Sequence, residues 1–108
     1  MTEWNVPATV LRIVDGDTIE LMLDLGWKMF HQANVRLQDV DAPEDETPEG
    51  LVSEQYVMTL LPIGSRVRIL SKGKDRNGRP LGHITLPDGR DLGVELISGG
   101  YARTWKSK

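Results

Sequence analysis

The chain has 108 residues, of which 39% are hydrophobic and 27% charged, with a formal net charge of −3, and this combination is typical of a single globular domain. No apolar run is long enough to cross a bilayer, so no membrane partner is expected, and the start MTEWNVPATV lacks the basic and apolar regions of a signal peptide, which favours a cytoplasmic location as encoded and leaves secretion open. Because the chain has no cysteine, disulfides, zinc thiolates and a cysteine nucleophile are excluded.

Three strands are predicted in the first part of the chain. Ala8–Val14 is rich in valine, isoleucine and leucine, which favour strands. Thr18–Asp24 alternates polar and apolar residues, and its apolar face comprises Ile19, Leu21 and Leu23. Gln32–Val40 is the third predicted strand, and Ala42-Pro43 ends it.

A helix is predicted to follow. Thr47–Glu49 supplies a capping hydroxyl, a proline at the first helical position and an acid in the first turn. Pro62 and Gly64 end the helix. The apolar stripe at helical spacing comprises Val52, Tyr56, Val57, Leu60 and Leu61.

Two more strands and a short helix are predicted in the second half. Ser65–Ser71 is a strand with Val67 and Ile69 inward, Asn77-Gly78 is a turn, and Leu81–Leu86 is the next strand. Asp91 is suited to cap a short helix that Gly99-Gly100 closes, and the apolar residues of this helix are Leu92, Leu96 and Ile97.

The order of these elements predicts the fold class. Five short strands are too few for a large sandwich, and a helix after the third strand is the arrangement of an OB-fold. We therefore expect an α+β, mainly β protein: a five-stranded OB-fold barrel with a helix after strand 3 and a second short helix near the C-terminus. Such barrels commonly bind oligonucleotides or oligosaccharides, although a fold alone does not establish a function.

Charge is distributed unevenly along the chain. Asp39–Glu49 holds six carboxylates and no base, whereas Lys72–Arg79 holds four bases and one acid. The net charge of −3 is not that of a typical nucleic-acid-binding protein, but it conceals two local patches of opposite sign.

Two carboxylates at strand ends suggest a metal site. The stretch Asp15–Asp17 interrupts a good strand pattern, and Asp-Gly is a common hairpin turn. Asp17 and Asp41 each lie at a predicted strand end, where a barrel can bring them together. Two carboxylates with carbonyl or water oxygens suit a hard cation such as Ca²⁺, Mg²⁺ or Mn²⁺.

Three further residues match the needs of phosphodiester hydrolysis. Glu44 is suited to accept a proton from water as a general base. Arg36 and Arg79 offer planar guanidinium groups that match phosphate oxygens. A cation and two arginines would stabilise the negative charge that grows on the phosphate during hydrolysis.

Four segments carry a family resemblance: DGDT at Asp15–Thr18, VRLQDVDAPE at Val35–Glu44, DRNGRPLG at Asp75–Gly82 and GVELISGGYAR at Gly93–Arg103. In this order and spacing they resemble the staphylococcal nuclease (thermonuclease) family, over roughly Thr9 to Arg103. The resemblance implies that the carboxylates of Asp17 and Asp41 and the carbonyl of Ala42 bind calcium, with Mg²⁺ or Mn²⁺ as alternatives. It also implies that Glu44 is the base acting on water and that Arg36 and Arg79 hold the scissile phosphate.

The chain departs from the family pattern in several places. The family's threonine after the second metal-binding aspartate is Ala42 here, which keeps the carbonyl but loses a hydroxyl contact and argues for reduced activity. Asn77 replaces the aromatic residue often found before the glycine of the arginine turn. We expect one nuclease-like OB-fold domain over residues 1–108, without the third helix of longer members.

Several residues have competing interpretations. Arg36 would also suit a structural ion pair with Asp39 or Glu44, and Arg79 a charged hairpin turn. The nucleic-acid-binding candidates are Lys72, Lys74, Arg76 and Trp105. For the three bases a solvated loop is favoured, and for Trp105 base stacking and a terminal anchor weigh equally. Trp4, Trp27 and Tyr56 are assigned to packing, and a structural role is favoured for His31 and His83, which are far apart and match no metal-binding spacing.

The main functional hypothesis is an enzyme. The resemblance implies a small, calcium-dependent nuclease that hydrolyses DNA and RNA with little sequence specificity and leaves 3′-phosphate ends, with single-stranded or frayed substrates preferred. The alternative is a non-catalytic OB-fold module that binds single-stranded nucleic acid. The features that favour the enzyme are Asp17, Arg36, Asp41, Glu44 and Arg79 together, because a binding module has no need to keep all five. A third hypothesis, an interaction subunit of a larger assembly, rests only on small size and the missing helix.

Overall fold

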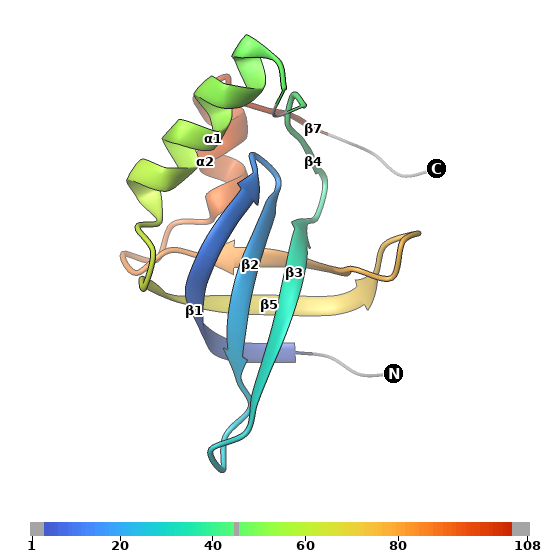
Figure 1. The fold of residues 1–108 in the computed structure, drawn as a ribbon, viewed down its shortest axis with the longest axis vertical. Helices are drawn as coiled ribbons and strands as arrows, with labels where there is room; N and C mark the ends of the chain where they lie inside the picture. The colour runs from blue at the N-terminus through green and yellow to red at the C-terminus, as the bar shows by residue number, and fades with distance from the viewer. Residues whose placement is uncertain (1–3, 45, 105–108) are drawn as a thin grey trace.

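The computed structural model describes residues 4–44 and 46–104. A closed barrel has the strand order β1-β2-β3-β6-β5, and its strands are β1 (Trp4–Asp15), β2 (Thr18–Asp24), β3 (Phe30–Leu37), β5 (Arg66–Lys74) and β6 (Pro80–Thr85). The other elements are the short strands β4 (Val40–Asp41) and β7 (Arg103–Thr104), which pair with each other, and the helices α1 (Pro48–Leu60) and α2 (Leu92–Ser98). Both helices lie at one end of the barrel, beside the β1–β2 turn, whereas the β2–β3 turn lies at the other end (Figure 1). The predicted OB-fold is confirmed.

The strand ends differ from those predicted. The third strand ends at Leu37 rather than Val40, because Asp39 adopts a left-handed conformation with φ 62° and turns the chain. The first strand starts four residues earlier than predicted, at Trp4, because its first part pairs with β5 from Trp4↔Ser71 to Thr9↔Arg66. Barrel closure comes from a short parallel pairing of β3 with β6, at Arg36↔Leu81 and Leu37↔Gly82.

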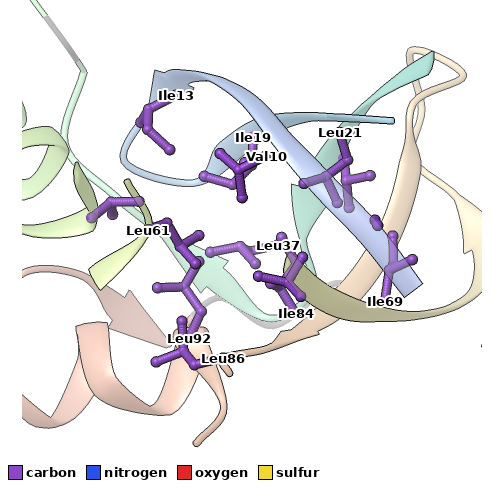
Figure 2. Packing of buried hydrophobic residues seen from close by; sticks show 14 of the residues in the cluster. Val10, Ile13, Ile19, Leu21, Leu37, Leu61, Ile69, Ile84, Leu86 and Leu92 are labelled. Carbon is purple, nitrogen blue, oxygen red and sulfur yellow. The ribbon is translucent and has the colours of Figure 1, made fainter. Parts of the chain in front are cut away.

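The core fills the barrel and continues beneath the helices. Ile19, Leu21 and Leu23 point inward and are fully buried, as the alternating pattern of their strand predicts. Val67 and Ile69 on β5 are also buried, which confirms their predicted orientation. Figure 2 shows how Leu61 at the end of α1 and Leu92 at the start of α2 extend this cluster from the barrel toward the helices.

Helix α1 begins as predicted but buries a different face. Thr47 caps it by accepting a hydrogen bond from Gly50 N at 3.0 Å. The predicted apolar stripe is wrong for Val52, which is 52% exposed, because the small residues Gly50 and Ser53 face the barrel instead. Tyr56 does pack against the core, as predicted.

The packing role predicted for Trp27 is also wrong. Trp27 is 97% exposed, in the β2–β3 connection, with a left-handed φ of 55°. Trp4, by contrast, is partly buried and packs against the core. The two tryptophans differ because Trp4 lies on the barrel strand β1, whereas Trp27 lies in the connection between β2 and β3. Within the described ranges, no helix is long and apolar enough to cross a membrane.

Close packing at Gly16 holds the β1–β2 turn against α1, and a substitution tests it. A Cβ at Gly16 would lie 2.9 Å from Ala42 Cβ and 3.1 Å from Ser53 Cβ. We expect Gly16→Ala to lower the free energy of unfolding by about 1–3 kcal/mol, as overpacking does. Gly73→Ala is the control, because a Cβ there meets nothing within 4 Å. Equal denaturation midpoints for the two variants would contradict the close approach.

Candidate active site

The β1–β2 turn presents Asp17 to the chain that follows β3. Asp15 Oδ1 accepts a hydrogen bond from Asp17 N at 3.1 Å, which folds the turn tightly. The Asp17 carboxylate then accepts hydrogen bonds from Thr18 Oγ1 at 3.2 Å and from Ala42 N at 3.0 Å. The last bond joins residues 25 positions apart, so the predicted proximity of Asp17 to the Asp41–Ala42 segment is present.

Arg36 lies at the end of β3 beside Asp17. Its Nη1 is 3.3 Å from Asp17 Oδ2, and both side chains are largely buried. The same nitrogen donates to the carbonyls of Val40 at 2.6 Å and Leu37 at 3.2 Å. The sequence suggested Asp39 or Glu44 as ion-pair partners, and the ion pair shown with Asp17 was not anticipated, because it depends on the pairing of β2 with β3 at Thr18↔Arg36.

The electrostatic environment disfavours a charged Asp17 in the absence of a cation. Burial, together with the neighbouring Asp15 carboxyl, raises the pKa of Asp17 to about 7, although Arg36 and the Ala42 N–H oppose this shift. Burial would also raise the pKa of Asp15, but its hydrogen bonds with Asp17 lower that pKa overall. The turn therefore holds two carboxyl groups that do not readily carry two negative charges together.

Asp17→Asn tests this strain in protein held in a chelator. The unperturbed aspartate pKa is 3.8 and the folded value is about 7, so the Asp17 contribution to stability is full below pH 4 and is lost as the pH rises through 7. Three pKa units correspond to about 4 kcal/mol. Since the substitution also removes the attraction to Arg36, we expect Asp17→Asn to be about 1–3 kcal/mol more stable than wild type at pH 8.

The measurement is the difference in melting temperature between wild type and Asp17→Asn across pH. This difference should shrink as the pH falls below the unfolded pKa of 3.8, where Asp17 becomes protonated in both folded and unfolded chains. A variant that melts below wild type at pH 8 would mean that Asp17 serves as a structural turn residue instead.

Asp17 contacts one residue of each of two surface cavities. The larger, about 660 Å³, is lined by Asp41, Ala42 and Glu44 together with the start of α1 and residues 100–103. A smaller one, about 320 Å³, is lined by Arg36, Arg79 and the β5–β6 turn. Asp17 contacts Ala42 of the first cavity and Arg36 of the second. Most of the predicted site residues therefore line one or the other of these two cavities, and Asp17 lies in contact with a residue of each.

The oxygen atoms of this segment fit a hard cation that takes only a few of its ligands from the protein. The available donors are oxygens only, from Asp17, the exposed Asp41 and the Ala42 carbonyl. No group of three or more His, Cys, Asp or Glu side chains gathers in the described ranges to form a cation site, so water would have to complete the shell. Ca²⁺ and Mg²⁺ accept such mixed carboxylate, carbonyl and water shells.

Arg79 lies in the hairpin turn between β5 and β6. Its Nε donates to Asp75 Oδ2 at 2.7 Å, and Asp75 Oδ1 accepts from the Arg79 and Asn77 backbone nitrogens. The charged-turn interpretation of Arg79 is thus correct as a description of the turn. It does not conflict with a phosphate role, because Arg79 lines the same cavity as Arg36.

The other predicted nucleic-acid contacts lie around this turn. Lys72 and Lys74 are exposed on the last part of β5 rather than in a loop, and Arg76 is exposed in the turn. Arg76 lines the cavity of Arg36 and Arg79. Trp105 lies outside the described residues.

Sequence reasoning did not anticipate the wall of the larger cavity formed near the C-terminus. Ser53 Oγ donates to the Tyr101 carbonyl at 2.5 Å, and the rings of Tyr56 and Tyr101 stack with centroids 4.0 Å apart. Arg103 pairs with Asp41 through β7 and β4 and lines the same cavity. No pattern marked β7, because it is two residues long and exposed.

A family model and several relatives match this chain. A model of the family described as staphylococcal nuclease homologue matches residues 34–108, which include Arg36, Asp41, Glu44 and Arg79. Asp17 precedes the matched span, but the structure brings it to Ala42 and Arg36.

Three relatives extend the comparison. Endonuclease YhcR of Bacillus subtilis (strain 168) is 34% identical over 116 residues, which cover 95% of this chain and 9% of that protein. An uncharacterized endonuclease of Escherichia coli O157:H7 is 32% identical, covering 91% of this chain and 60% of that protein. Micrococcal nuclease of Shigella flexneri is 36% identical, covering 72% and 41%. The chain spans less than two thirds of the length of these curated relatives. The family model matches more than two thirds of the residues of this chain, which shows that the chain belongs to the staphylococcal nuclease family.

Proposed function

We propose that this chain is a nuclease that hydrolyses phosphodiester bonds in DNA and RNA with little sequence specificity, uses Ca²⁺, and leaves 3′-phosphate ends. Mg²⁺ and Mn²⁺ are alternative cations. The observation that carries the proposal is the position of Asp17, which contacts Ala42 in the cavity of Asp41 and Glu44 and Arg36 in the cavity of Arg79. The nuclease names of the relatives support it.

In the proposed reaction, water attacks the phosphorus and the bond to the 5′-oxygen breaks. Glu44 accepts a proton from the attacking water, as a general base does. The 5′-oxygen leaves and takes a proton from solvent, and the phosphate stays on the 3′-oxygen. Arg36 and Arg79 hold the phosphate oxygens, where their charge stabilises the transition state more than the ground state.

Asp17, Asp41 and the Ala42 carbonyl would hold the cation. Bound there, it would add positive charge beside the phosphate and neutralise the carboxylates around it. Arg36 is already fixed without substrate, because the Leu37 and Val40 carbonyls orient its guanidinium. Such preorganisation lowers the cost of ordering the side chain when phosphate binds.

The proposed function predicts metal-dependent cleavage. We expect purified protein to fragment single-stranded DNA and RNA with Ca²⁺, and to leave both intact in a chelator. Labelled fragments should carry 3′-phosphates, so removing the phosphate enzymatically should retard them on a gel. Failure to cleave either polymer with Ca²⁺, Mg²⁺ or Mn²⁺ would reject the enzyme and leave the OB-fold module that binds single strands. Fragments ending in 3′-hydroxyls would reject only the proposed leaving group.

A further inference from the structure

A third cavity opens in the barrel wall on the other side of Arg79. It measures about 450 Å³ and lies between the start of β1, the first half of β3 and the β5–β6 hairpin. Its size falls within the roughly 300–1,000 Å³ of ordinary ligand sites. Arg79 lines both this cavity and the one that contains Arg36, so the two cavities share this residue.

The opening follows from how the barrel closes. Within the described strands, β3 pairs with β6 only at Arg36 and Leu37, so the earlier part of β3 has no partner on that side. The β6 strand starts at Pro80, which has no N–H to offer a neighbouring strand. Trp4 from β1 and His31 from β3 then face each other across the end of the wall.

The lining has the chemistry of a nucleobase site. The rings of Trp4 and His31 lie with centroids 5.5 Å apart at 57°, and both border the cavity. Aromatic faces bind unstacked bases of any sequence. The exposed amide of Asn34 can both donate and accept at a base edge, and the exposed Lys74 adds positive charge at the rim.

Arg79 connects this lining to the proposed phosphate site. Arg79 Nε donates a hydrogen bond to Asp75 Oδ2. Within the described residues, the two terminal nitrogens of Arg79, Nη1 and Nη2, make no hydrogen bond with protein. The side chain is 36% exposed. A guanidinium so placed can hold a phosphate whose attached nucleotide lies on the Trp4 side.

We propose that the cavity between β1, β3 and the β5–β6 hairpin is a nucleobase subsite, in which Trp4 and His31 stack on one unpaired base of a nucleic-acid strand whose adjoining phosphate contacts Arg79. This inference rests on the proposed function, because it places the substrate relative to the proposed phosphate site. A base enters such a cavity only when it is unpaired and unstacked, so the substrate class is single-stranded or frayed nucleic acid.

The test measures the binding of a fluorescent oligodeoxythymidylate and of the same oligomer with abasic positions throughout, in chelator to suppress cleavage. We expect His31→Ala to weaken binding of the intact oligomer about 5- to 150-fold, because stacking on one base contributes roughly 1–3 kcal/mol. Trp4→Leu should act in the same direction. Wild type and His31→Ala should bind the abasic oligomer equally.

The matched control is Trp27→Ala, which removes an aromatic side chain that is 97% exposed in the β2–β3 connection and lines none of the three cavities. This variant should bind both oligomers as wild type does. His31 is exposed, so its variant carries the test even where the partly buried Trp4 variant fails to fold. Three results would overturn the subsite. His31→Ala could bind the intact oligomer as tightly as wild type does, or it could lose affinity for the intact and abasic oligomers equally. The third such result is that wild type shows no detectable binding.

Cleavage in Ca²⁺ separates this inference from the proposed function. An active nuclease whose KM is unchanged by His31→Ala would overturn the subsite and leave the enzyme intact. Base-dependent binding lost in His31→Ala, in a protein that cleaves nothing, would reject the enzyme and support the subsite. For His31→Ala we expect KM to rise by the same factor as the dissociation constant of the oligomer, with kcat nearly unchanged.

Discussion

We expect the Glu44→Gln protein to cleave single-stranded DNA about 10²- to 10⁴-fold more slowly than wild type while it binds Ca²⁺ equally well. Glu44 is exposed and lines the larger cavity together with Asp41 and Ala42. A glutamine has nearly the same shape but cannot accept the proton of the attacking water. The loss should therefore appear in kcat, because base catalysis acts in the transition state rather than in substrate binding.

Two comparisons make this prediction specific. Glu46→Gln removes the same charge two residues further along, from an exposed side chain that does not line the cavity, and should retain nearly full activity. Asp41→Ala should instead weaken Ca²⁺ binding, measured by calorimetry. Equal small losses of activity in Glu44→Gln and Glu46→Gln would show that Glu44 contributes only general negative charge.

The second large effect is expected at Arg79. We expect Arg79→Ala to reduce cleavage about 10²- to 10³-fold, because a preorganised donor to the transition state is lost. The fold should be little affected, since partly exposed ion pairs such as Arg79–Asp75 contribute roughly 0–1 kcal/mol. Arg79→Lys keeps the charge but not the planar fork, so it should recover only part of the activity.

The chain contains a matched control for this substitution. Arg90 Nε donates to Asp88 Oδ2 at 2.7 Å, as Arg79 Nε does to Asp75 Oδ2, and each arginine lies in a turn. Arg90 also contacts Glu95 and lines none of the three cavities. Arg90→Ala should leave cleavage unchanged. Comparable losses in both variants, measured as kcat/KM at equal salt, would mean that Arg79 acts only through general charge.

The local sequence determined most elements of the fold. Period-two alternation predicted Thr18–Asp24 with the bounds observed for β2, and the Thr47-Pro48 start and the Asp91 cap located the two helices. These signals succeed because strand alternation and helix capping depend on neighbouring residues. The candidate residues Asp17, Arg36, Glu44 and Arg79 could be proposed from the sequence because each lies in a short segment that resembles a family motif.

Contacts between distant segments were decided only by the tertiary structure. The ion pair of Arg36 with Asp17, the division of the site between two cavities, and the exposure of Trp27 depend on strand register and barrel closure. So does the meeting of Trp4 with His31, whose strands are separated in the barrel wall by β2 on one side. A periodic pattern shows which face of an element is buried, but register and closure determine which side chains meet across elements.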